Sequence, residues 1–188
     1  MNTQLKGTNF RAFVPALRTL RGDAALERTI ELLPPDLGGT LRVNGFVTSG
    51  WYPTESFAAI HEAAQRACNE GPELSREIGR EAVKLDFSSG VYRLITLSLA
   101  PETLFRWGPR VVALYYDRGR IVIEESLVGR AMARFEGFTG FRRSVWEDLI
   151  GGTLGLLELA GAKNIVTRVL SGGQDGDSNM GVSARWST

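Results

Sequence analysis

The strongest helical pattern in the chain lies in its C-terminal half, between Phe141 and Gly161. Its apolar residues recur mostly at steps of three and four, which is typical of a helix with one buried face: Val145, Trp146, Leu149, Leu156 and Leu159. Further apolar residues lie outside this face: Ile150, Leu154 and Leu157. We therefore expect a sheet on one side of this helix and helices or a second subunit on the other.

Apolar and polar side chains alternate on both sides of that helix, as in half-buried strands. Two such runs precede it, at 120–126 and 130–138, and two follow it, at 164–170 and 180–186. The short turns within each pair predict antiparallel hairpins. The C-terminal half therefore reads as β-β-α-β-β.

Helical patterns predominate in the N-terminal half. They cover 10–20, 24–33, 55–68, 73–87 and 101–115, and Pro109 is expected to kink or split the last one at Gly108. The glycine-rich stretch 36–50 reads as a connector, and 91–99 is an ambiguous apolar run for which we prefer helix. The fold class is thus α+β: a helical N-terminal half followed by β-β-α-β-β, with an antiparallel sheet packed on a long helix. Residues 1–8 are expected to form a flexible arm and 9–188 a single domain.

Composition excludes several classes of protein. The net charge of +1 gives no reason to expect a nucleic-acid surface. The single cysteine, Cys68, rules out an internal disulfide and a cysteine-cluster metal site. The N-terminus lacks a signal-peptide pattern and no apolar run could span a membrane, so we expect a cytoplasmic protein.

Candidate chemistry is sparse. His61 and Cys68 lie two helical turns apart, about 10 Å, which is too far for a nucleophile and its base. No acid–base pair has a spacing suitable for catalysis, so we favour a binding protein over an enzyme. The loop 173–179 alternates Asp175, Asp177 and Asn179 as a calcium loop does, but lacks the glycine and the glutamate that such a loop needs. A hairpin turn accounts for these residues, and neither a metal nor a cofactor is expected.

Several residues are candidates for binding. Glycines inside the long helix cost helix stability, about 1 kcal/mol each, and suggest close approach by a neighbouring helix or a dimer mate. We take as interface residues Gly151, Gly152, Gly155 and Phe105. Arg142 could meet an anionic ligand or an acidic partner, or belong to a solvated surface pair with its neighbour. Trp51 and Tyr52 could line a pocket mouth or anchor the connector. The candidate ligand-binding set is Trp51, Tyr52, Trp107, Trp146 and Arg142.

The order of elements resembles a known superfamily. The resemblance is carried by 101–105, 112–119, the strand 121–125, Gly129-Arg130-Ala131, 135–138, the glycine-bearing helix and the final 182–186. In these stretches the chain is similar to heme-NO-binding domains, bacterial 4-vinyl reductase domains and TRAPP trafficking subunits. It is also similar to a group of myxobacterial proteins of this length. The resemblance runs from Trp51 onward, about two-thirds of the chain.

Departures from these families limit what the resemblance implies. Heme-NO-binding domains need a proximal histidine and a Tyr-x-Ser-x-Arg motif, whereas this chain has His61 alone and lacks that motif. One cysteine cannot build the metal site of cysteine-rich vinyl-reductase members. What remains is a fold that, in the TRAPP subunits, dimerises through helices and can bury an acyl chain.

Three functions stay open. The first is a non-enzymatic sensor or adapter with a regulatory role, which binds an apolar or acyl-type small molecule and forms a homodimer. The second is a TRAPP-like module that binds protein partners without a ligand. The third is an enzyme acting on a small cyclic substrate.

Overall fold

The computed structural model describes residues 1–87 and 99–187. The N-terminal half consists of helices and one short pair of strands. These elements are β1 (Gln4–Lys6), α1 (Gly7–Arg21), α2 (Asp23–Glu31), α3 (Pro35–Arg42), β2 (Trp51–Pro53), α4 (Thr54–Cys68) and α5 (Glu73–Phe87). Among the described residues, no helix is long and apolar enough to cross a membrane.

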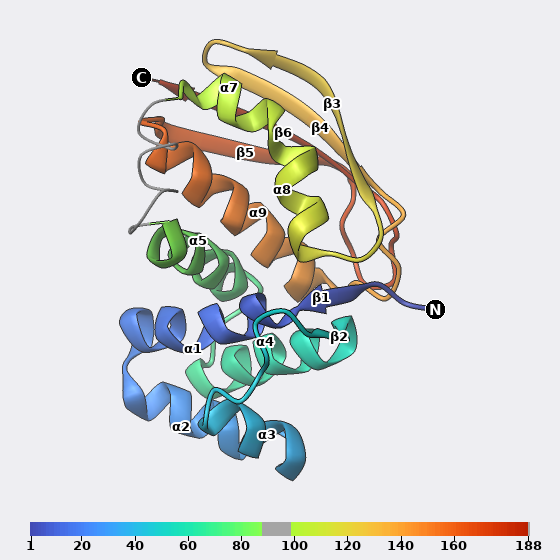
Figure 1. Ribbon diagram of the computed structural model, residues 1–188. Coiled ribbons are helices and arrows are strands. Elements are labelled where there is room, and N and C mark those ends of the chain that lie inside the picture. Colours follow the sequence, from blue (N-terminus) through green and yellow to red (C-terminus); the bar gives the residue numbers. More distant parts are fainter. Residues whose placement is uncertain (88–98, 188) are drawn as a thin grey trace.

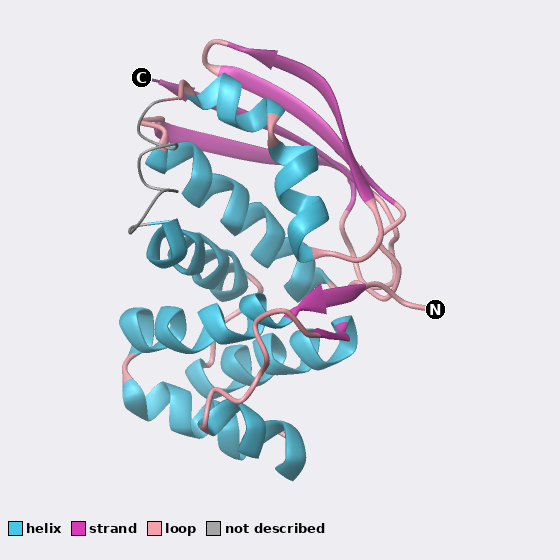
Figure 2. Cartoon of the chain, in the orientation of Figure 1, coloured by secondary structure: helices cyan, strands magenta, loops and turns pink. Residues whose placement is uncertain are grey.

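The C-terminal half contains a four-stranded antiparallel sheet in the order β3-β4-β6-β5. Its elements are α7 (Pro101–Arg106), α8 (Gly108–Tyr115), β3 (Arg120–Leu127), β4 (Arg130–Glu136), α9 (Arg143–Leu159), β5 (Lys163–Gly172) and β6 (Met180–Ser187). The predicted α+β class and the β-β-α-β-β order are confirmed (Figure 2).

The long helix α9 lies between the sheet and α5, so it is covered on both sides as its apolar pattern predicts (Figure 1). Beyond α5 come α1 and α4, and α2 and α3 form the outer layer. The buried core runs through these layers and contains an aromatic cluster around Trp146. The side of α9 that faces away from the sheet is thus covered by a helix of the same chain, α5, rather than by a second subunit.

The helix predicted over 101–115 is divided between α7 and α8, as the proline predicts. Trp107 joins the two helices, and Pro109 occupies the first turn of α8, where its missing N–H costs no hydrogen bond. The helix preferred for 91–99 falls almost wholly on residues 88–98, outside the part of the chain that the structure describes.

Two stretches differ from the expectation. The first residues do not form a loose arm: Gln4–Lys6 pairs with Trp51–Pro53, and Leu5 is completely buried. Within the stretch expected to be a connector, Pro35–Arg42 is the helix α3. Packing outweighs its poor helix propensity, because Gly38 lets the backbone approach the Ile30 carbonyl of α2 and Leu41 is fully buried.

Candidate functional site

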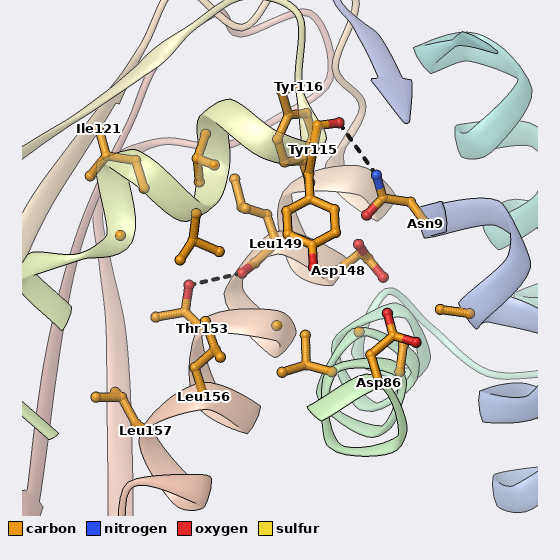
Figure 3. Close-up of a pocket in the computed structure, with 18 of the residues that line it drawn as sticks. Asn9, Asp86, Tyr115, Tyr116, Ile121, Asp148, Leu149, Thr153, Leu156 and Leu157 are labelled. Atoms are coloured by element: carbon orange, nitrogen blue, oxygen red, sulfur yellow. Dashed lines mark hydrogen bonds between the residues drawn. The ribbon is translucent and has the colours of Figure 1, made fainter. Parts of the chain in front are cut away.

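A cavity of about 110 Å³ lies where α5, α8, α9 and the sheet meet (Figure 3). Helix α5 contributes Ala82 and Val83, α8 contributes Val111 and Val112, and α9 contributes Leu149, Leu156 and Leu157. Side chains of β3 and β4 complete the wall: Ile121, Ile123, Ala133 and Phe135. The wall is therefore largely hydrocarbon and suits an apolar occupant.

Glycines on both helices bring α5 and α9 close together beside the cavity. A Cβ atom on Gly151 would lie 2.0 Å from the carbonyl oxygen of Arg76, and one on Gly155 would lie 2.7 Å from that of Arg80. On α5, a Cβ atom on Gly79 would lie 2.2 Å from the Asp148 carbonyl oxygen. The close backbone approach predicted at the α9 glycines is therefore made by α5 of the same chain.

Asp148 is the buried carboxylate in the cavity wall, and the residue is 9% exposed. One of its carboxylate oxygens, Oδ1, faces Gly79, where a side chain would leave it no room. The same oxygen is 3.4 Å from Nε2 of the fully buried His61. Neither ring nitrogen of His61 has a hydrogen-bond partner among the described residues.

Asp86 marks the open side of the cavity, because it is exposed while the other described residues of the wall are buried or half-buried. Burial of its carboxyl group nevertheless raises its pKa. No hydrogen bond or ion pair to this carboxylate is formed within the described part of the chain.

The remaining polar groups of the wall come from α1, α8 and α9. Asn9 donates a side-chain hydrogen bond of 3.4 Å to the Tyr115 carbonyl, and the Thr153 hydroxyl donates one of 3.0 Å to the Leu149 carbonyl (Figure 3). Tyr116 is 7% exposed. Burial, with a further contribution from the charge of Asp148, raises the Tyr116 pKa well above its usual value. Its hydroxyl therefore stays protonated and able to donate a hydrogen bond.

The five residues predicted to bind a ligand lie apart from this cavity. Trp51 is exposed, with Lys6 Nζ 5.6 Å from its ring centroid, and Tyr52 packs on Phe10. Trp107 is exposed between α7 and α8. The other two occupy the start of α9: Trp146 is buried in the aromatic cluster, and Arg142 forms a 3.1 Å ion pair with Glu62.

The predicted interface residues are also placed by the structure. Gly151 and Gly155 are buried against α5, whereas Gly152 and Phe105 are half-buried and line the cavity. These four residues do not form one exposed surface.

The side chains of the loop 173–179 bind backbone N–H groups. Asp175 accepts a hydrogen bond of 2.7 Å from Arg143 N at the start of α9, and Asp177 accepts one of 2.9 Å from Gln174 N. Asn179 accepts one from Gly137 N at 3.1 Å. Each group thus has the role expected in a turn, and Asp175 compensates the basic residues at the helix N-terminus.

Sequence reasoning did not identify the polar residues of the cavity. The signal for Asp148 was present, because a carboxylate next to Leu149 and three residues after Val145 falls on the buried face of the helix. Asp86 and Tyr116 offered no comparable signal. Their role depends on how α5 and the end of α8 are placed around the cavity, which periodicity does not determine.

Comparison with known proteins gives a result at the level of the fold. No protein-family model matches the chain, and a search of curated protein sequences finds no match. Solved structures do match over nearly the whole length. An oxygen-binding H-NOX domain related to soluble guanylate cyclases, in its oxygen complex, is 15% identical with a TM-score of 0.65, covering 97% of this chain and 95% of that chain.

Two further H-NOX structures agree with this result. The unliganded Fe(II) H-NOX protein from K. algicida is 11% identical with a TM-score of 0.70, covering 97% of each chain. An H-NOX protein from a study of heme distortion is 14% identical with a TM-score of 0.71, covering 97% of this chain and 95% of that chain. The predicted similarity to heme-NO-binding domains is thus confirmed for the fold, and those to 4-vinyl reductases and TRAPP subunits stay predictions. This chain has the H-NOX fold.

Proposed function

We propose that this protein is a non-enzymatic sensor or adapter that binds a small apolar molecule in the cavity between α5, α8, α9 and the sheet. The observation that carries the proposal is the largely hydrocarbon wall of this cavity. Apolar cavities take up small apolar molecules, as a cavity of roughly 150 Å³ in another protein takes up benzene. A volume of about 110 Å³ fits a ligand of similar size.

The titratable groups of the wall support binding rather than catalysis. Among the described lining residues there is no cysteine, histidine, serine or lysine, and the Thr153 hydroxyl donates to its own helix. His61 and Cys68 lie outside the wall. Burial and the neighbouring Glu70 raise the pKa of the half-buried Cys68 thiol, which opposes formation of a nucleophilic thiolate.

The solved neighbours include heme proteins, but the residues of this cavity do not fit heme. Pockets for larger ligands measure about 300–1,000 Å³, and this one measures about 110 Å³. The only histidine of the chain, His61, is outside the wall. A tyrosine ligand to iron would have to ionise, and the raised Tyr116 pKa opposes that.

The charges of the cavity wall also oppose heme binding. Heme carries two propionate groups, which need positive or hydrogen-bonding partners. The described lining residues include no arginine and no lysine, whereas Asp86 and Asp148 are negative. The proposed ligand is therefore not heme.

The position of the cavity supports a sensing role. One part of its wall belongs to α1 and α5 of the helical half, and the other belongs to α8, β3 and β4 of the sheet half. A ligand would contact both halves at once and favour the arrangement in which they close around it. The homodimer belongs to this proposal as well, and it would use a surface other than Gly151 and Gly155.

The test is thermal unfolding with toluene as an apolar probe. We expect toluene to raise the melting temperature of the wild type in a concentration-dependent manner, because a ligand that binds only the folded state stabilises it. Ala82→Leu should abolish this shift, since Ala82 lines the cavity and leucine is also a good helix former.

Ala113→Leu is the matched control. Ala113 is exposed on α8 and lies outside the cavity wall, so this variant should respond to toluene as the wild type does. An unshifted wild-type melting temperature at saturating toluene would contradict the proposal. So would an equal shift in the wild type and in Ala82→Leu.

A further inference from the structure

The acidic residues of the cavity wall restrict the chemistry of its ligand. Two carboxylates, Asp86 and Asp148, line an otherwise apolar space, and no described lining residue is basic. Because opposite charges attract strongly where water is excluded, such a wall favours a cation and disfavours an anion.

Of the two carboxylates, Asp148 is the buried one. It is 9% exposed, and its carboxylate accepts no hydrogen bond from another described residue. His61 Nε2 lies 3.4 Å from its Oδ1, and His61 is not part of the cavity wall. A buried carboxylate without hydrogen bonds is costly, and a ligand that donates to it would remove that cost.

Tyr116 provides a second unpartnered polar group in the same wall. Its residue is 7% exposed, and its hydroxyl makes no hydrogen bond to another described residue. Tyr116 and Asp148 line the same cavity. Asp86, at the open side, adds negative charge along the entry route and would raise the local concentration of cations.

We propose that the ligand is a small apolar amine, whose ammonium group binds the Asp148 carboxylate and whose hydrocarbon part fills the cavity. This inference rests on the proposed function, since it names the ligand class of the same cavity. Asp148 is already largely buried in the free protein, so most of the dehydration on binding falls on the ammonium group. A neutral hydrocarbon of equal size would leave Asp148 unpaired.

Isothermal titration calorimetry on the full chain tests the proposal with three probes of matched shape: benzylamine, benzyl alcohol and toluene. We expect benzylamine to bind about tenfold or more tightly than toluene, because a hydrogen bond to a charged group contributes roughly that factor. Benzyl alcohol should fall between them, since it donates a hydrogen bond without a charge.

Asp148→Asn tests the named residue. This substitution keeps the size of the side chain and removes its charge, and it should lower the preference for benzylamine over toluene about tenfold. Glu81→Gln is the control, because it removes a carboxylate from α5, which borders the cavity, at a position outside the cavity wall. It should retain the wild-type preference.

The outcomes separate the two proposals. If toluene binds as well as benzylamine, or if Asp148→Asn retains the preference in a folded protein, the amine is refuted while the apolar cavity stands. If Asp148→Asn does not fold, the preference of the wild type for benzylamine over toluene decides whether the amine proposal holds. If none of the three probes binds, both the amine and the proposed function are refuted.

Discussion

The contact between α5 and α9 predicts opposite effects of the same substitution at two adjacent glycines. At Gly151 an alanine Cβ would lie 2.0 Å from the Arg76 carbonyl oxygen, which is backbone and cannot rotate away. At Gly152 the nearest atom would be a methyl carbon of Val83 at 3.3 Å, which a small side-chain movement accommodates. Gly151→Ala therefore forces α5 and α9 apart, whereas Gly152→Ala can be accommodated without moving either helix.

The magnitudes follow from two opposing effects. Overpacking a core costs about 1–3 kcal/mol, and we take about 3 kcal/mol for a clash with backbone. Alanine gains about 1 kcal/mol over glycine inside a helix. Gly151→Ala should thus destabilise the fold by about 2 kcal/mol, or about 4–8 °C in melting temperature for a chain of this size. Gly152→Ala should leave stability unchanged or raise it by up to about 1 kcal/mol.

Urea unfolding followed by circular dichroism, with melting curves on the same samples, measures both variants against the wild type. The slope of the unfolding free energy with urea should stay constant if only native-state packing changes. Equal stability of the two variants, or a Gly151→Ala protein as stable as the wild type, would refute the packing of α5 on α9 described above.

Three further predictions concern other parts of the chain. Because burial raises the pKa of Asp86, its native form holds a proton more tightly than the unfolded chain, so the wild type loses stability as pH rises through and above about 4. Asp86→Asn should therefore be more stable than the wild type at pH 7 and equal to it in acid, which melting curves against pH will check. Leu5→Ala should cost about 2–5 kcal/mol in urea unfolding, since this side chain is fully buried, whereas Gln4→Ala on the exposed side of β1 should cost little. Asp175→Ala should cost about 1 kcal/mol through loss of the hydrogen bond from Arg143 N, and a melting temperature equal to the wild type would contradict that role.

The sequence predicts those elements whose own pattern determines their structure. The long helix α9 and the four strands around it were predicted because their periods of hydrophobicity are clear. The strand β1 was missed because three residues carry little pattern, and it is held by pairing with a segment some fifty residues away. Helix α3 was missed because Gly38 lowers helix propensity while permitting the contact with α2 that stabilises the helix.

The cavity illustrates the limit of periodicity most clearly. Aromatic and basic residues attract attention in a sequence, yet Trp146 packs in the core and Arg142 pairs with Glu62 on the surface. The polar residues of the cavity wall instead come from α1, α5, the end of α8 and α9, and they meet only through tertiary packing, which includes the glycine contacts between α5 and α9. Asp148 was the one residue among them that the helical pattern could have revealed.

The most direct test of the account is methyl NMR of the full chain during a titration with toluene. We predict shifts confined to methyl groups of the cavity wall, such as Val83, Val111 and Leu156, with Leu26 and Leu41 of the outer helices unchanged. Shifts scattered over the surface, or none at saturating toluene, would contradict a binding cavity between α5, α8 and α9.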